Sequence, residues 1–178
     1  MTKLNFYLKE GGNGKVHITH SKLLDFLAEA GYGRVKQGET YILAHQQNKQ
    51  LRQIDASELS RYIQSKIRDT NSLEVLEPFV KGVGNFLTAK KLELLPEHKV
   101  ISDMDSKESS RFYFKNCYVV VTKEGFDEFN YNSLEQSIWT NRLIRRKFRL
   151  AQAKPKGQFE RFCQKIAGGD PKKFKQLQ

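Results

Sequence analysis

The first third of the chain alternates short apolar runs with glycine-rich and polar breaks. Two strand-like runs, residues 4–8 and 15–19, flank the Gly-Gly-Asn-Gly of residues 11–14, a pattern typical of a hairpin. A helix is predicted next, and Gly31 can end it in the left-handed conformation. Its apolar residues recur at helical spacing at Leu23, Phe26, Leu27 and Ala30.

A second strand pair is predicted at residues 41–44 and 51–54. Asp55 and Glu58 then resemble a capping box, which marks the start of a helix. The apolar positions of this helix are Leu59, Tyr62, Ile63 and Ile67. The pattern therefore predicts a ββαββα-like unit over residues 1–70.

The middle region, residues 71–140, is predicted to be a helical segment followed by a β-hairpin. Residues 72–97 have a helical pattern that Pro78 and the Gly-Val-Gly of residues 82–84 are expected to interrupt. Residues 111–122 are rich in aromatic and β-branched side chains, and a turn at 123–125 leads into residues 126–131.

Residues 141–178 form a basic region of linker and helices. Residues 152–157 predict a loop, and the Gly168-Gly169 pair closes a helix with an apolar stripe. The stripe consists of Phe159, Phe162, Cys163 and Ile166. Asp170 and Pro171 start another helix, yet the sequence ends at Gln178. We therefore expect an α+β protein that continues into a further domain.

Net charge is concentrated at this end of the chain. The total is +11, and residues 141–178 hold 12 Lys and Arg against two Asp and Glu. Four arginines fall at helical spacing, so a helix there would carry them on one face, where they repel one another unless anions are bound. Arginine binds phosphate bidentately. The predicted nucleic-acid-binding residues are Arg142, Arg145, Arg146, Lys147, Arg149, Lys154 and Lys156. A solvated face or an interdomain contact is the alternative.

Neither secretion nor membrane insertion is predicted. The N-terminus has no apolar signal region, and the longest apolar run is too short to cross a bilayer. Cys117 and Cys163 are far apart and form no CxxC motif, which suits a reducing compartment. A cytoplasmic location without a membrane partner is therefore expected.

Three motifs resemble catalytic or ligand-binding motifs, but none predicts a catalytic site. Gly14-Lys15 is followed by Val16, which does not fit a phosphate loop. Asp103 and Asp105 have the spacing of metal-binding carboxylates in archaeo-eukaryotic-type primases. In those enzymes a histidine follows the pair, and here all four histidines precede it. A histidine pair at residues 17 and 20 has two intervening residues and lacks a third ligand. No catalytic residue, metal or cofactor is therefore assigned.

Several stretches after residue 110 match one known pattern of motifs. Residues 114–116 match a strand that enters an Asn-Gly turn, although Cys117 stands where the pattern usually has glycine. Residues 119–125 match the next strand and its turn, and residues 158–162, 166–171 and 177–178 match the end of the pattern. The region from residue 111 to the C-terminus therefore resembles the segment that precedes the ATPase in phage and plasmid primase-helicases of the superfamily 3 type.

The resemblance implies an ATP-dependent DNA helicase with its ATPase after this region. Members of that family form hexamers chiefly through the ATPase, so homo-oligomers of the full-length protein are implied. The predicted function is therefore DNA binding on behalf of a downstream helicase domain in DNA replication. The strand type is left open. Two alternatives remain: a divergent primase or nickase, and a protein-interaction module that docks on a helicase.

Overall fold

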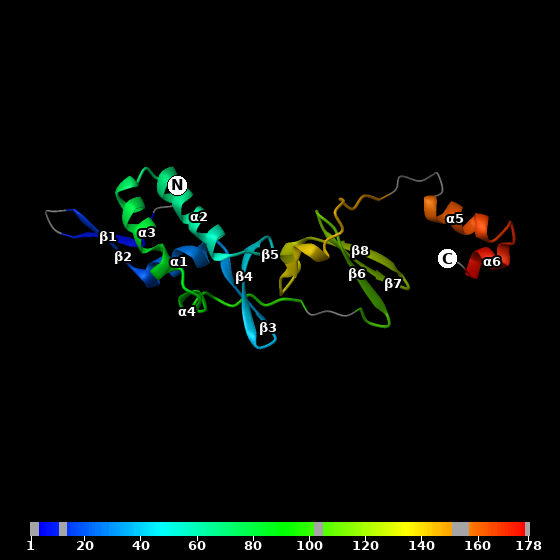
Figure 1. Cartoon of the computed structure of the whole chain (residues 1–178). Coiled ribbons are helices and arrows are strands. Elements are labelled where there is room, and N and C mark those ends of the chain that lie inside the picture. The colour runs from blue at the N-terminus through cyan, green and yellow to red at the C-terminus, as the bar shows by residue number, and fades with distance from the viewer. Residues whose placement is uncertain (1–3, 11–13, 102–104, 151–156, 177–178) are drawn as a thin grey trace. The chain divides into compact units, whose positions relative to one another are not determined.

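The chain has an α+β fold (Figure 1). The structure is a computed structural model that describes residues 4–10, 14–101, 105–150 and 157–176. Two compact units make up the chain, Met1–Lys147 and Phe148–Gln178. Three sheets lie in the described part of the first unit.

The predicted N-terminal hairpin and helix are confirmed. β1 (Tyr7–Glu10) pairs antiparallel with β2 (Lys15–Ile18), and α1 (His20–Glu29) follows. Gly31 has a φ of +86° directly after the helix, the left-handed conformation expected there. The helix buries one apolar face through Leu23, Phe26 and Leu27.

The second sheet has four strands in the order β3-β4-β5-β9. β4 (Thr40–Gln47) and β5 (Gln50–Gln53) form the predicted antiparallel pair. The structure adds β3 (Tyr32–Gln37), which pairs antiparallel with β4 and was not predicted. β9 (Ile138–Trp139) pairs parallel with β5, so a segment far along the sequence completes this sheet.

Packing at Gly33 explains why sequence periodicity missed β3. A Cβ at Gly33 would lie 2.4 Å from Nε2 of His98 and 2.6 Å from the carbonyl oxygen of Pro96. The neighbouring Arg34 N–H donates to that Pro96 carbonyl at 2.9 Å. Gly33 is therefore a close-approach position in a strand, whereas glycine in a sequence suggests a break.

Three helices follow the sheet strands. α2 (Ala56–Asp69) begins as predicted, because Asp55 accepts a hydrogen bond from the Glu58 N–H at 2.8 Å. α3 (Leu73–Phe86) and the short α4 (Ala89–Leu92) come next.

The predicted interruption of α3 is wrong, because the helix continues through Pro78 and both glycines. Val75 and Phe79 are fully buried in the main core, which anchors the helix on both sides of the proline. At Gly82 a Cβ would lie 2.4 Å from the Phe86 ring, and that ring stacks on Phe79 at 6.1 Å. Tertiary packing therefore outweighs the low helix propensity of proline and glycine.

The third sheet is a three-stranded antiparallel meander. β6 (Ser109–Tyr113), β7 (Tyr118–Thr122) and β8 (Gly125–Phe129) lie in that order. The predicted hairpin is confirmed as β7 and β8, but the run 111–122 forms two strands with a turn between them. The Phe114 N–H closes this turn onto the Cys117 carbonyl at 2.8 Å.

Two 3₁₀ helices frame β9: η1 (Tyr131–Ser133) and η2 (Thr140–Arg142). The hydroxyl of Tyr131 donates to the Phe114 carbonyl and so ties η1 to the turn after β6. Burial raises the pKa of this phenol, which keeps the donor protonated. Residues from the meander, η1 and β9 share a small core of Ile101, Tyr113, Tyr118, Tyr131, Leu134 and Ile138.

The second unit contains α5 (Gln158–Ile166) and α6 (Pro171–Gln176). The glycine pair at residues 168 and 169 follows the end of α5, as predicted, and has φ angles of +59° and +84°. Asp170 accepts the Lys172 N–H at 2.9 Å, which caps α6. The predicted loop at 152–157 lies outside the described residues except for its last position.

Acidification should destabilise the first unit through His98. Burial lowers the pKa of His98 below its ordinary value of 6.5, and His45 adds to this effect, while a hydrogen bond with Gly31 opposes it. As the pH falls, His98 of the unfolded chain therefore takes up its proton before His98 of the folded protein does. The folded state keeps its full free energy of unfolding above pH 6.5, and this free energy decreases as the pH falls below 6.5.

Thermal melts at about pH 7.5 and about pH 5.5 measure this loss. The His98→Gln variant keeps a polar group beside Gly31 and should show a smaller drop in Tm. An equal drop in both proteins would contradict the assignment to His98.

Candidate nucleic-acid interface

The predicted arginine helix is wrong. η2 ends at Arg142, and residues 143–150 contain no helix. The i, i+3, i+4, i+7 spacing of the arginines therefore does not place them on one helical face. The positions of the candidate phosphate ligands instead follow from the non-helical backbone of residues 143–150.

Sheet-type hydrogen bonds replace the helical ones. The Ile144 N–H donates to the Tyr113 carbonyl at 2.7 Å, and the Lys115 N–H donates to the Arg146 carbonyl at 3.2 Å. Phe114 and Ile144 form a parallel bridge. We call residues 142–147 the basic segment. It lies along the outer edge of β6 where that strand ends, opposite the side that pairs with β7.

Apolar side chains explain this course. Leu143 packs against the core formed by the meander and η1, and Ile144 is half-buried. These two half-buried residues are adjacent, and the three residues after them are exposed. The bulky residues therefore fix the basic segment to the first unit and leave its charges at the surface.

The cations of the basic segment fall into two groups. Arg142 is held by the protein: its Nη1 donates to the Ile101 carbonyl at 3.3 Å, and its guanidinium lies 5.7 Å from the centre of the Tyr113 ring. Arg145, Arg146 and Lys147 are exposed. Among the described residues, none of these three takes part in an identified ion pair.

Charges of both signs lie around the meander. Lys115 is exposed in the turn that contacts the basic segment. The acidic residues Asp127 and Glu128 lie on β8, at the opposite edge of the sheet. Asp105 lies at β6 itself, where its carboxylate accepts the Arg111 N–H at 2.9 Å. The exposed cations therefore gather at the end of β6 rather than along its whole edge, and a localised positive field attracts polyanions.

The remaining predicted ligands lie elsewhere. Arg149 is exposed and belongs to the second unit. Lys154 and Lys156 lie outside the described residues. The structure thus brings together Arg145, Arg146 and Lys147 with Arg142 beside them.

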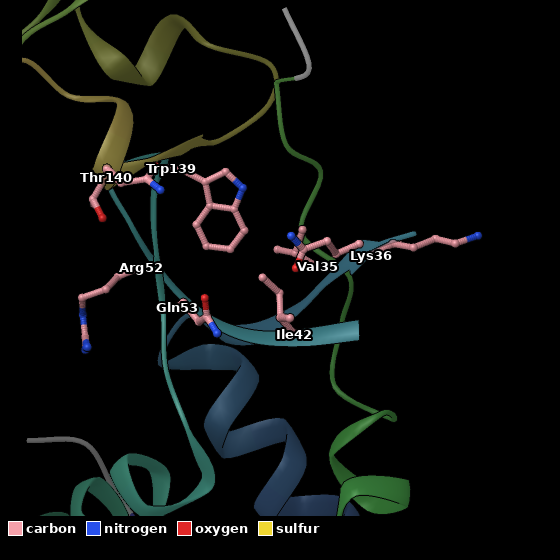
Figure 2. A pocket seen from close by; sticks show the side chains of 9 residues that line it. Val35, Lys36, Ile42, Arg52, Gln53, Trp139 and Thr140 are labelled. Atoms are coloured by element: carbon pink, nitrogen blue, oxygen red, sulfur yellow. The ribbon is translucent and has the colours of Figure 1, made fainter. Parts of the chain in front are cut away.

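The second sheet carries a pocket that the sequence did not predict. It has a volume of about 430 Å³ and is lined by residues of β3, β4, β5, β9 and η2. Figure 2 shows Trp139 near Val35 and Ile42, with Gln53 beside them and the Lys36 side chain extending away from the indole. The signal in the sequence is that Trp139 is the single tryptophan.

The described residues offer little for acid–base or metal chemistry. No group of three or more His, Cys, Asp or Glu side chains there could hold a metal ion. His20 Nε2 lies 3.2 Å from the Phe86 carbonyl oxygen, a structural contact. Burial raises the pKa of Cys117 to about 11, so its thiolate is scarce at neutral pH. Of the aspartate pair, Asp103 lies outside the described residues, and Asp105 accepts the Arg111 N–H.

Comparisons with protein-family models, curated proteins and solved structures found no match. The resemblance to primase-helicases therefore stays a hypothesis. Within the described part of the chain, the helices are too short or too polar to span a bilayer.

Proposed function

We propose that this chain is a DNA-binding region of a phage- or plasmid-type replicative primase-helicase, and that it holds DNA for an ATPase domain. The observation that carries the proposal is the exposed cluster Arg145, Arg146 and Lys147 on the edge of β6. Phosphate contacts of Arg and Lys supply most of the affinity of sequence-independent binding and fix the register of the protein on DNA.

The basic segment suits a phosphate backbone because three exposed cations follow one another in it. Its backbone bends between them, where the Arg146 N–H donates to the Ile144 carbonyl at 2.8 Å. Hydrogen bonds to the end of β6 and the packing of Leu143 anchor the segment, which lowers the entropy lost when phosphates bind. Lys115 adds a fourth exposed cation beside the basic segment.

The second unit supports the proposed link to a helicase domain. On α5, Phe162 is 57% exposed and Ile166 is 58% exposed, and the two are one helical turn apart. An exposed apolar pair on an amphipathic helix is typical of a surface that another protein surface covers. In the proposed protein, the covering surface belongs to the helicase domain.

Fluorescence anisotropy with the complete chain tests DNA binding. A labelled oligodeoxythymidylate and a labelled duplex of random sequence should both bind at low salt. With about three phosphate contacts, log affinity should fall with log salt at a slope of about −2 to −3. The absence of an anisotropy change at low salt would overturn the proposal and favour the protein-docking alternative.

A further inference from the structure

The pocket on the second sheet combines an apolar floor with a polar margin. Val35 is buried, and Ile42 and Trp139 pack against the cluster that contains it, so the floor is apolar. Gln53 lies at the margin, and Lys36 lines the pocket while its exposed side chain extends outward from it (Figure 2). The volume of about 430 Å³ lies within the range of small-ligand sites.

This combination suits one nucleotide. A nucleobase has an apolar face that stacks on an indole and a polar edge that exchanges hydrogen bonds. Amide side chains both donate and accept, so Gln37, Gln53 and Asn141 at the pocket can meet the edge of any base. Lys36 supplies a cation for the attached phosphate.

Arg52 also lines the pocket but plays a different part. Nη1 of Arg52 donates to Oε2 of Glu58 at 3.0 Å, and Nη2 donates to the other carboxylate oxygen. This bidentate pair neutralises the guanidinium and holds its side chain. Phosphate attraction at the pocket therefore depends chiefly on Lys36.

The pocket and the basic segment are adjacent in the sequence. Trp139, Thr140 and Asn141 line the pocket, and Arg142 follows them directly in η2. Six residue positions separate Trp139 from Arg145, so at most about 20 Å of backbone lies between the indole and the first exposed cation. In a duplex both faces of each base are already stacked, so only an unpaired base has a face free for Trp139.

We infer that the pocket binds an unpaired base of single-stranded nucleic acid, stacked on Trp139, while neighbouring phosphates contact the basic segment. The inference rests on the proposed DNA binding and deepens it, because it assigns the preferred substrate as single-stranded. Duplex binds through phosphates alone and leaves the pocket empty.

Intrinsic fluorescence tests the inference directly, because Trp139 is the single tryptophan. Oligodeoxythymidylate should quench Trp139 with the same midpoint as its anisotropy titration. Inorganic polyphosphate has the charges without the bases, so it should displace the labelled oligonucleotide without quenching. Random duplex should also bind without quenching.

Two variants extend this test. Trp139→Ala should weaken oligodeoxythymidylate binding by about 5- to 100-fold, the range that loss of one stacked base gives, and duplex binding should be unchanged. Trp139→Phe keeps an aromatic face and should weaken binding far less. Because Trp139 also packs on the sheet, Lys36→Glu serves as a second variant at the margin. Its matched control is Lys15→Glu, on the separate β1-β2 sheet.

The outcomes separate the two proposals. No anisotropy change with any DNA overturns both. Anisotropy that reports binding without quenching of Trp139 overturns the pocket inference and leaves the proposed DNA binding intact. Equal affinity of Lys36→Glu and Lys15→Glu for oligodeoxythymidylate would also overturn the pocket inference.

Discussion

Reversing the exposed cations at the edge of β6 is expected to abolish DNA binding. The variant replaces four exposed residues with glutamate: Arg145, Arg146 and Lys147 at the edge of β6, and Arg149 in the second unit. Each lost charge-assisted contact weakens binding, and four carboxylates add repulsion, so affinity for single strands and duplex should fall at least about 100-fold. Arg142 is kept because it contacts the Ile101 carbonyl and Tyr113.

Single replacements by alanine should be mild. Each should reduce the slope of log affinity against log salt by about 0.7 for single strands and about 0.9 for duplex. Folding should be unaffected, because these side chains are exposed and the apolar anchors Leu143 and Ile144 remain. Circular dichroism and Tm check this point before any binding measurement.

A control with the same change in net charge separates local from general electrostatics. It places four glutamates at exposed cations on other elements: Lys15, Lys22, Arg61 and Lys90. This control should lose far less affinity than the edge variant. Equal affinities and equal salt slopes for the edge variant and the unmodified chain would refute the phosphate role and favour docking onto a protein.

The basic segment also shows where sequence reasoning succeeds and fails. Charge density is a property of composition, so the concentration of Lys and Arg could be read from residues 141–178. Conformation could not be read in the same way. The helical spacing of the four arginines does not decide the conformation, which depends on contacts such as the hydrogen bond from the Ile144 N–H to the Tyr113 carbonyl across a large sequence separation.

Local signals predicted local structure well. Gly31 and Asp55 mark helix ends through their own backbone and side-chain geometry, and both behave as expected. The Trp139 pocket depends on β9 pairing with β5, a contact between residues 51 and 139. The sequence around residue 51 and the sequence around residue 139 contain no signal for this pairing, so the pocket could not be predicted.

In helix α3 the local sequence signals predict an interruption that the structure does not contain. Pro78 removes one backbone donor and the glycines weaken the interior, so burial must hold the helix. Phe79 is fully buried in the main core and stacks on Phe86. Replacing Phe79 with alanine should therefore lower the free energy of unfolding by about 3–5 kcal/mol.

Urea denaturation measures this loss, and Val80→Ala is the matched control on the same helix. Val80 is 46% exposed, so its replacement should change the free energy by less than about 0.5 kcal/mol. Under conditions in which it is folded, the Phe79→Ala variant should still bind DNA, because the basic segment packs on the separate core around Tyr113. A loss below about 1 kcal/mol would mean that α3 is held by its own helix propensity after all, contrary to the role assigned to Phe79.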